Sequence, residues 1–427
     1  MRSRPTTLLL TTALVASLTA CGSGDGGGPE PDGTTRLSLL LFGGAEEVAG
    51  YQAMLDEYED ATPDVEVELT PVGTQDDLLA KLATGFAGGI PPDVFLVNFR
   101  SFRQFADQGA IRPVQPFLDA SEELSVEDFV EPPLEAFRVD GQLVCQPQNV
   151  SSLVVYYNRD LFEARDVPLP REGWTWDDFL ATAEQLTGDG TYGLGTEPSL
   201  IRVAPFVWSN GGEVVDDHDA PTALALGDGP AREALDWFLD LSLVHGVVPP
   251  DVEEQSEDAE SRFIAGRLGM YLNSRKSVPD LRTIDGFTWD VAPLPVAPGG
   301  APVTMLHSDA YCIADGTGNE QAAWDLVEFA MGTRGQEILA ASGRTVPSRR
   351  DVLTSPAFLS EDVPPASAEV FVDNAEIARA TPSTASWRRV EKLADDILEQ
   401  IFHGRIEREA GIARLLEETR DVFARAG

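Results

Sequence analysis

The most constraining feature of this chain is a regular alternation of short apolar segments and amphipathic segments after residue 35. Three apolar segments have the composition of strands, and each precedes a segment whose apolar side chains recur at helical spacing. The strands are expected at 36–42, 65–69 and 93–97, and the helices at 46–59, 76–87 and 101–108. Strands joined through helices pair in parallel with right-handed crossovers. The series therefore predicts an α/β fold with a doubly wound sheet.

The same mixture of segments continues to the C-terminal end, without an internal repeat. Further strands are expected at 142–145, 153–157 and 268–272. Further helices are expected at 175–186, 230–244, 258–265, 320–331, 335–341, 387–402 and 407–425. A chain of 427 residues exceeds the size of one ordinary hydrophobic core, so two domains are expected.

The N-terminal end has the pattern of an export signal. Arg2 and Arg4 precede an uncharged, largely apolar stretch that is too short to span a bilayer, so residues 1–20 are predicted to be a signal peptide. The sequence Leu-Thr-Ala-Cys that ends at Cys21 resembles the lipobox of bacterial lipoproteins, in which the cysteine is lipidated. The alternative is an ordinary signal with an incidental cysteine. Residues 21–35 are rich in Gly, Pro and Asp and are expected to form a flexible linker.

The formal net charge of −40 limits the possible partners. Nucleic acids need a basic surface, so nucleic-acid binding is not expected. Anionic lipid would repel such a chain, and contact with the membrane is expected only through the lipid anchor. The acidic residues are spread along the whole chain, which indicates a strongly solvated surface. The expected location is the extracellular face of the cell membrane.

Six short segments, spread over most of the chain after residue 35, share their order and spacing with one protein family. They are 91–95 (PPDVF), 153–162 (LVVYYNRDLF), 173–179 (GWTWDDF), 263–273 (FIAGRLGMYLN), 292–300 (APLPVAPGG) and 322–347. Together they resemble family 1 of the bacterial extracellular solute-binding proteins, the maltose-binding-protein-like receptors of ABC importers. Each segment alone is a weak signal, and their common order carries the resemblance.

This resemblance implies a type II periplasmic-binding-protein fold, with two α/β lobes joined by crossing strands and a ligand in the cleft between them. On this reading lobe 1 comprises 36–148 and 305–345, and lobe 2 comprises 149–304 and 346–427. The implied ligand is a sugar or oligosaccharide, and the implied protein partners are the permease subunits of an ABC importer. A monomer without a cofactor is expected.

Candidate ligand residues of the first lobe follow the ends of predicted strands, because open parallel sheets bind ligands beyond the carboxyl ends of their strands. Carboxylates and amides pair with sugar hydroxyls, and aromatic rings stack on sugar faces. The candidates are Phe42, Glu46, Gln75 and Asn98. Glu46 also fits a purely structural role, since an acid in the first turn of a helix complements the helix dipole.

The remaining candidates come from the resemblance to the family. They are Asn149, Ser151, Trp208, Asn210, Asn273, Ser274, His307, Asp309 and Trp387. Trp208 and Trp387 have the alternative of simple burial in the core or between helices. Lys276 stands where family members often carry an aromatic residue, so the expected stacking platform is missing there.

Apart from Cys21, the chain contains only Cys145 and Cys312. The resemblance places both on neighbouring crossing segments, which implies a disulfide in an exported protein. The alternative is two separate buried thiols. A metal site is not expected, because the four histidines are widely separated and the acidic stretch at 216–219 lacks the pattern of an EF-hand.

Two other functional classes remain open from the sequence. A secreted glycosidase would need a pair of carboxylates, and 71 acidic residues leave room for one. However, the nucleophile elbow, the zinc-protease motif and the P-loop are all absent from the sequence. The second class is a receptor that senses its ligand without transport.

Overall fold

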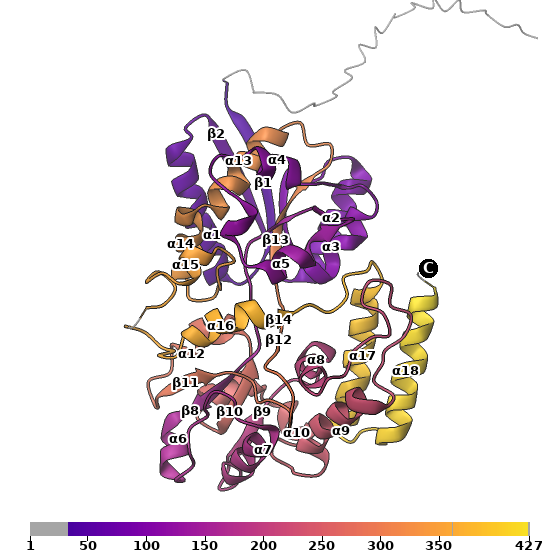
Figure 1. Cartoon of the computed structure of the whole chain (residues 1–427). Coiled ribbons are helices and arrows are strands. Elements are labelled where there is room, and N and C mark those ends of the chain that lie inside the picture. Colours follow the sequence, from indigo (N-terminus) through magenta and orange to yellow (C-terminus); the bar gives the residue numbers. More distant parts are fainter. Residues whose placement is uncertain (1–32, 361, 426–427) are drawn as a thin grey trace, which may run out of the picture.

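The computed structural model describes residues 33–360 and 362–425, so the expected signal peptide and Cys21 lie outside the described residues. The chain folds into two α/β lobes, one above the other in Figure 1, with helices around a central sheet in each. This is the two-lobe α/β architecture that the sequence predicts. Among the described residues, no helix combines the length and apolar character needed to cross a bilayer.

The sheet of lobe 1 has the strand order β2-β1-β3-β13-β4, and β7 also pairs with β13. The first three strands are parallel as predicted, whereas β13 runs antiparallel to β3. Their bounds are β1 Thr35–Phe42, β2 Val65–Val72, β3 Val94–Asn98, β4 Ile111–Arg112, β7 Gln146–Pro147 and β13 Asp309–Ala314. Every residue of β3 and β13 is buried, as expected for central strands covered on both faces.

Helices cover both faces of this sheet. They are α1 Ala45–Ala61, α2 Gln75–Gly88, α3 Phe99–Ala106, α4 Gln115–Ala120, α5 Glu131–Ala136, α13 Glu320–Met331, α14 Thr333–Ala341 and α15 Arg350–Leu353. The hydroxyl of Thr74 caps α2 by accepting from the Asp77 N–H, and Gly89 ends it in a left-handed conformation with φ of 71°. These local signals fix where the helix starts and stops.

The sheet of lobe 2 has the order β11-β8-β10-β9. Strand β10 is parallel to β9 and antiparallel to β8, so the sheet is mixed. The bounds are β8 Val154–Asn158, β9 Tyr192–Gly195, β10 Leu268–Asn273 and β11 Trp289–Ala292. The capping box expected around Thr175 and Asp178 is present at the start of α7.

The helices of lobe 2 surround this sheet, and α17 and α18 pack side by side at one edge of the molecule (Figure 1). They are α6 Arg159–Ala164, α7 Trp176–Gln185, α8 Leu200–Ser209, α9 Gly229–Leu243, α10 Asp251–Glu254, α11 Ala259–Ile264, α12 Val278–Leu281, α17 Trp387–Phe402 and α18 Arg408–Ala424. The side chains of α17 and α18 that face inward join a buried apolar cluster with α8 and α9.

The strand predicted at 142–145 is interrupted in the structure. Strands β5 (Arg138–Val139) and β6 (Gln142–Leu143) form a small hairpin, and Asp140 and Gly141 turn with φ of 51° and 79°. A two-residue turn with positive φ at both positions matches the twist of a hairpin, which favours Asp-Gly there. The chain then leaves the hairpin and enters β7.

The two lobes meet where crossing segments run beside each other. The Ser151 N–H donates to the His307 carbonyl at 2.7 Å, and the His307 N–H donates to the Ser151 carbonyl at 2.8 Å. A third connection pairs β12 (Thr304–Met305) with β14 (Ala378–Arg379), just after α16 (Glu369–Ile377). The exact lobe boundaries stay a prediction, because one buried apolar cluster includes side chains of lobe 1, of the lobe 2 sheet and of residues 346–378.

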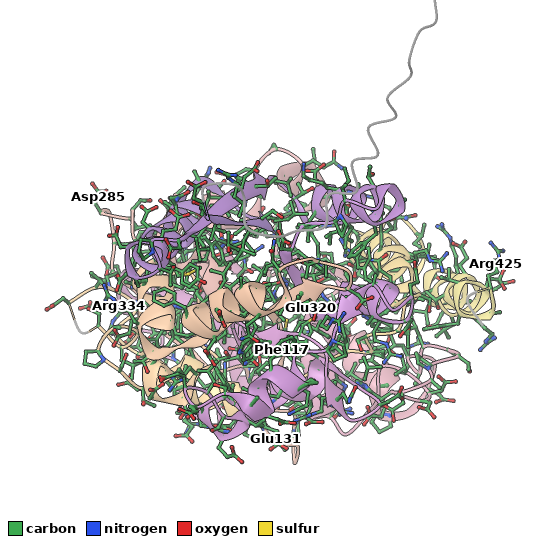
Figure 2. All side chains as sticks on the ribbon, turned by 90° about the horizontal axis from the view of Figure 1, so that it is seen from above. Phe117, Glu131, Asp285, Glu320, Arg334 and Arg425 are labelled. Carbon is green, nitrogen blue, oxygen red and sulfur yellow. A yellow bond between two sulfur atoms is a disulfide. The ribbon has the colours of Figure 1, made fainter. Side chains whose placement is uncertain are left out.

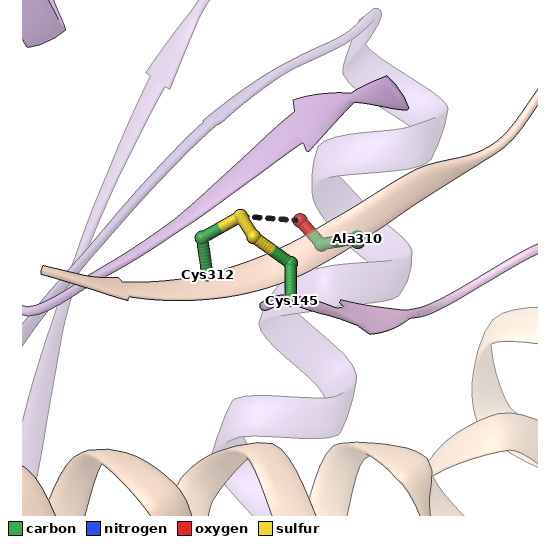
Figure 3. Close-up of a disulfide and its surroundings, with 3 residues drawn as sticks. All are labelled: Cys145, Ala310 and Cys312. Carbon is green, nitrogen blue, oxygen red and sulfur yellow. Dashed lines mark hydrogen bonds between the residues drawn. A yellow bond between two sulfur atoms is a disulfide. The ribbon is translucent and has the colours of Figure 1, made fainter. Parts of the chain in front are cut away.

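The structure joins Cys145 and Cys312 by a disulfide (Figure 3). Cys312 lies on β13, and Cys145 immediately precedes β7, the neighbour of β13. The Ala310 carbonyl oxygen lies 4.0 Å from Cys312 Sγ. The bond therefore ties together two segments of lobe 1 just before they cross to lobe 2.

Candidate ligand-binding site

A cavity of about 280 Å³ lies between the lobes and receives side chains from both. Lobe 1 and the crossing segments contribute Phe42, Glu47, Arg100, Asn149, Ser151, Met305, His307, Asp309, Arg344, Thr345 and Val346. Lobe 2 contributes Glu197, Ser199, Ile201, Arg202, Asn273, Ser274, Lys276 and Asp395. Clefts between domains are a common place for small-molecule sites.

The lobe 1 wall forms because neighbouring parallel strands end at the same edge of the sheet. Phe42 is the last residue of β1, and Arg100 lies in the first turn of α3, directly after β3. Glu47 lies in the first turn of α1, which follows β1. The strand-end rule thus places an aromatic ring, a cation and a carboxylate in the same wall.

Asn98 organises several of these groups from behind the wall. Its side chain is buried, and it donates from Nδ2 to Asp309 Oδ1 at 3.0 Å. Its Oδ1 accepts from Arg100 Nε, also at 3.0 Å. Arg100 Nη1 then donates to both carboxylate oxygens of Glu391 in α17, at 2.8 and 2.9 Å. A continuous polar chain therefore runs from β13 of lobe 1 to a helix of lobe 2.

Polar side chains also gather at the crossing segments. The Asn149 side-chain oxygen accepts from the Asp309 N–H at 3.0 Å, and its amide nitrogen lies 3.4 Å from Asp309 Oδ2. Burial raises the pKa of Asp309, while the amides of Asn98 and Asn149 oppose that rise. Burial also lowers the pKa of His307 well below its ordinary value, so the ring is neutral at pH 7.

Glu47 and Arg344 form an ion pair at the edge of the cavity, with 2.8 Å between Glu47 Oε2 and Arg344 Nε. Burial raises the pKa of Glu47 to about 7, although the guanidinium acts in the opposite direction. The pair therefore carries a carboxyl group that gains or loses its proton near neutral pH.

The lobe 2 wall is built around Arg202. Its guanidinium lies 2.8 Å from Glu197 Oε2, and Nη2 donates to Asn273 Oδ1 at 3.3 Å. Asp395 accepts from the Leu200 N–H at 2.7 Å, and burial raises its pKa to about 7. Lys276 is the one lining cation of the described structure without a hydrogen bond or ion pair from its side chain. Loss of solvent within the cleft lowers its pKa.

This lining suits a polar, uncharged or weakly charged ligand with many hydroxyl groups. Four carboxyl groups and four cations face one another in the wall, so donors and acceptors are both available. Phe42 is the one six-membered aromatic ring among the lining residues and can cover an apolar face. No group of three or more histidine, cysteine or acidic side chains that could hold a metal ion occurs in the described residues.

The structure brings most of the predicted ligand residues to this cavity. Those that line it are Phe42, Asn149, Ser151, Asn273, Ser274, His307 and Asp309. Asn98 lies behind them, in contact with Asp309. Their roles toward a ligand stay a prediction.

Five predicted ligand residues lie elsewhere. Glu46 is exposed at the start of α1, because the next residue, Glu47, is the one turned to the cavity. Gln75 donates to Ser101 Oγ at 3.4 Å, and Asn210 donates to the Pro230 carbonyl at 2.9 Å, both outside the cavity.

The two tryptophans pack in the protein interior, which is the alternative role that the sequence left open for them. Trp208 is buried, with the Arg379 guanidinium 4.9 Å from its ring centre. Trp387 is fully buried in the apolar cluster of lobe 2, beside Phe423. Their apolar surface is removed from water by helix packing, which leaves no face toward the cavity.

Sequence reasoning missed several lining residues. These are Glu47, Arg100, Glu197, Ser199, Ile201, Arg202, Met305, Arg344, Thr345, Val346 and Asp395. The segment 197–199 could have been found, because it follows the carboxyl end of β9. Asp395 lies in the middle of α17 and carries no local signal of this kind.

Comparison with known proteins agrees with this architecture. Residues 53–364 match the model of the bacterial extracellular solute-binding protein family. A putative binding protein of Brucella abortus is 23% identical over 359 residues, covering 78% of this chain and 80% of the relative. An arabinooligosaccharide-binding protein of Halalkalibacterium halodurans is 23% identical over 356 residues, covering 78% of this chain and 76% of the relative.

A solved structure shares the whole two-lobe fold. An ABC substrate-binding protein of Listeria monocytogenes in complex with cycloalternan superposes with a TM-score of 0.81 at 20% identity. The match covers 92% of this chain and 98% of that protein. The fold is therefore that of a type II periplasmic binding protein. Since the family model also covers well over half of the sequence, the chain belongs to the bacterial extracellular solute-binding protein family.

Proposed function

We propose that this protein binds a sugar or oligosaccharide in the interlobe cavity and delivers it to the permease subunits of an ABC importer. The observation that carries the proposal is a cavity lined from both lobes by carboxylates, amides, guanidinium groups and one aromatic ring. A sugar offers hydroxyls that donate and accept, together with a flat apolar face. The cycloalternan and arabinooligosaccharide ligands named for two similar proteins support the same class.

Delivery is proposed to depend on closure of the lobes. A ligand shifts an open–closed equilibrium only by its differential affinity for the closed form, so side chains of both lobes have to contact it. Phe42 of lobe 1 and Lys276 of lobe 2 can meet this requirement, because both line the cavity. The Lys276 ammonium group forms no ion pair within the described protein, so it is available to a ligand. Hinge closure about a ligand is a known motion of such receptors.

The test is a titration calorimetry screen of the mature protein with mono- and oligosaccharides. Phe42→Ala and Lys276→Met are each expected to weaken binding of the best ligand by about tenfold, as for loss of one ligand contact that the closed lobes would bury. Lys392→Met is the matched control, because Lys392 is exposed on α17 outside the cavity and should leave the affinity unchanged. If no carbohydrate binds, or if the two cavity variants bind like the wild type, the proposal is wrong.

The two alternatives predict different results in the same screen. A hydrolase would release shorter sugars, so chromatography of the mixture after long incubation should show new products. A receptor that only senses its ligand would bind without supporting uptake in cells that express the permeases. We propose neither, because the family and its similar proteins are binding proteins.

We also propose that the mature protein is a monomer tethered outside the cell membrane through lipidated Cys21. The support is the lipobox-like sequence that ends at Cys21 and the Gly-, Pro- and Asp-rich residues that follow it. Two acyl chains on one cysteine hold a protein stably at a membrane, whereas one chain does so only marginally.

A further inference from the structure

A second concave surface lies away from the ligand cavity, at the junction of α3 with α17 and α18. We call it the arginine groove. Its volume is about 920 Å³, and its lining includes Arg103, Arg389, Arg420 and Arg425 together with one acidic residue, Asp107. Figure 2 shows Arg425 at the edge of the molecule beside α17 and α18. The groove is therefore opposite in sign to the whole chain, whose formal net charge is −40.

Two of these arginines are unusual within the molecule. In residues 33–360 and 362–425, Arg389 and Arg420 are the two arginines whose side chains make no hydrogen bond or ion pair. Both are exposed, one in the first turn of α17 and one near the end of α18. In a chain with 71 acidic and 31 basic residues, an arginine without an ion pair needs an explanation. Two such arginines in one concavity provide an unsatisfied pair of planar donors.

The rest of the groove adds polar and apolar contacts. Thr222, Thr384 and Ser386 supply hydroxyl groups, and Pro221 and Phe423 supply apolar surface. Arg103 and Arg425 already have acidic neighbours on their own helices, with 2.8 Å to Asp107 and 3.6 Å to Asp421. The free donors of the groove are thus concentrated on Arg389 and Arg420.

We propose that the arginine groove is a docking site for an acidic segment of a partner protein. A groove of this size exceeds what one small anion fills, and exposed arginines hold a single hydrated anion only weakly. A protein segment with several carboxylates can contact both free arginines and the apolar surface together. An anionic membrane is a poorer fit, because the remaining surface of the chain would repel it.

The arginine groove lies between the two lobes, so the affinity of a docked segment depends on how the lobes are arranged. Arg103 and Asp107 belong to α3 and its end in lobe 1, whereas the other lining residues come from lobe 2. A segment that contacts both sides binds best at one relative position of the lobes. Docking and ligand occupancy are then coupled, and the coupling acts equally in both directions.

The proposal is tested by fluorescence anisotropy with the mature protein and a labelled short peptide rich in glutamate, with its glutamine counterpart as the uncharged probe. The double variant Arg389→Gln/Arg420→Gln is expected to bind the acidic peptide about tenfold more weakly than the wild type. The control is Arg171→Gln/Arg414→Gln, which removes the same charge from exposed arginines outside the groove and should change binding less than twofold. Rising salt should weaken the wild-type complex.

Several outcomes would overturn the proposal. They are failure of the wild type to bind the acidic peptide, equal losses in both double variants, and equal binding of the glutamine peptide. Displacement of the peptide by pyrophosphate at a similar concentration would identify a small-anion site instead. Arginine-dependent binding to phosphatidylglycerol vesicles without peptide binding would identify a membrane contact. Carbohydrate affinity of the same variants, measured separately, tests the proposed function and should not change.

Discussion

Asn98 Nδ2 donates a hydrogen bond to Asp309 Oδ1 at 3.0 Å, across the antiparallel pair of β3 and β13. The two residues are register partners at the end of the sheet that faces lobe 2. Because Asn98 also accepts from Arg100, its single amide orients a carboxylate and a guanidinium of the cavity wall. It acts on the cavity through these two neighbours.

Asn98→Ala is therefore expected to affect both stability and ligand binding. Asp309 and Arg100 each lose a buried partner, which typically costs roughly 1–3 kcal/mol. Urea denaturation should show the loss, and calorimetry should show weaker binding of the best carbohydrate. Asn210→Ala is the matched control, since Asn210 bonds to the Pro230 carbonyl outside the cavity. Equal effects of both substitutions would contradict the assigned role of Asn98.

The ion pair between Arg100 and Glu391 should be sensitive to removal of either partner. Glu391 is the more buried, with a side chain 1% exposed, against 10% for Arg100. Arg100→Met leaves the buried carboxylate with only its 3.4 Å contact to Arg388, which is expected to cost up to about 3 kcal/mol of unfolding free energy. Addition of Glu391→Gln should recover part of that loss in a double-mutant cycle. The exposed pair Arg414–Glu418 is the control and should contribute less than about 1 kcal/mol.

The carboxyl group of Asp395 should make the protein less stable as the pH rises. Burial raises its pKa to about 7, so the folded protein holds a proton that the unfolded chain has released. The stability linked to this proton is full below the unfolded pKa of 3.8 and is lost as the pH rises to about 7. Asp395→Asn should remove this dependence.

The difference in unfolding free energy between Asp395→Asn and the wild type should thus grow by roughly 1–3 kcal/mol between pH 4 and pH 7.5, in favour of the variant. Urea denaturation at several pH values gives the measurement. The amide oxygen still accepts from the Leu200 N–H, so the helix contact is kept. A difference that is constant with pH would show that Asp395 is ionised throughout.

The disulfide between Cys145 and Cys312 closes a loop with a sequence separation of 167 residues. The entropy model predicts that a loop of this length destabilises the unfolded chain by about 5 kcal/mol. The double variant Cys145→Ser/Cys312→Ser should lose stability of that order, and the wild type should lose it on reduction. Mass spectrometry of unreduced peptides from freshly exported protein should find the bonded pair, and two free thiols there would refute the prediction.

The proposed lipid anchor predicts that the protein changes its location when Cys21 is substituted. Cys21→Ser removes the thiol that would be acylated, so the mature protein should appear in the culture medium. Immunoblots of medium and membrane fractions distinguish the two locations. The disulfide variant Cys145→Ser/Cys312→Ser is the control and should remain with the membrane. Retention of the Cys21→Ser protein at the membrane would rule out the lipid anchor.

The fold could be predicted from the sequence because its signals are local. Apolar runs such as 36–42 and the capping box at Thr175 each lie within a few residues, and they fix most strands and helices. The residues of the cavity wall could be predicted only where they lie at or just after the end of a strand. The choice between Glu46 and Glu47 depends on the rotation of a helix by about 100° per residue, and both acids satisfy the local pattern.

The rest of the site depends on contacts between distant segments. Arg344 lies in the turn after α14, and Asp395 lies within a helix whose apolar pattern predicts only which face packs inward. Trp387 shows the same limit, because the sequence predicts its helix and not the direction of its ring. Whether such residues line the cavity can be determined only from a structure that contains both lobes.

The disulfide also limits how this molecule can bend. It joins β13 to the residue before β7 on the lobe 1 side of the crossing, and beyond it Ser151 and His307 are paired through their backbones. These two of the three connecting segments thus leave lobe 1 from one cross-linked base and continue as a two-stranded ribbon. Such a ribbon twists and flexes as a unit, so we expect the motion between the lobes to approach rotation about a single axis. We expect the closure proposed above to follow this rotation, with little sideways sliding of one lobe against the other.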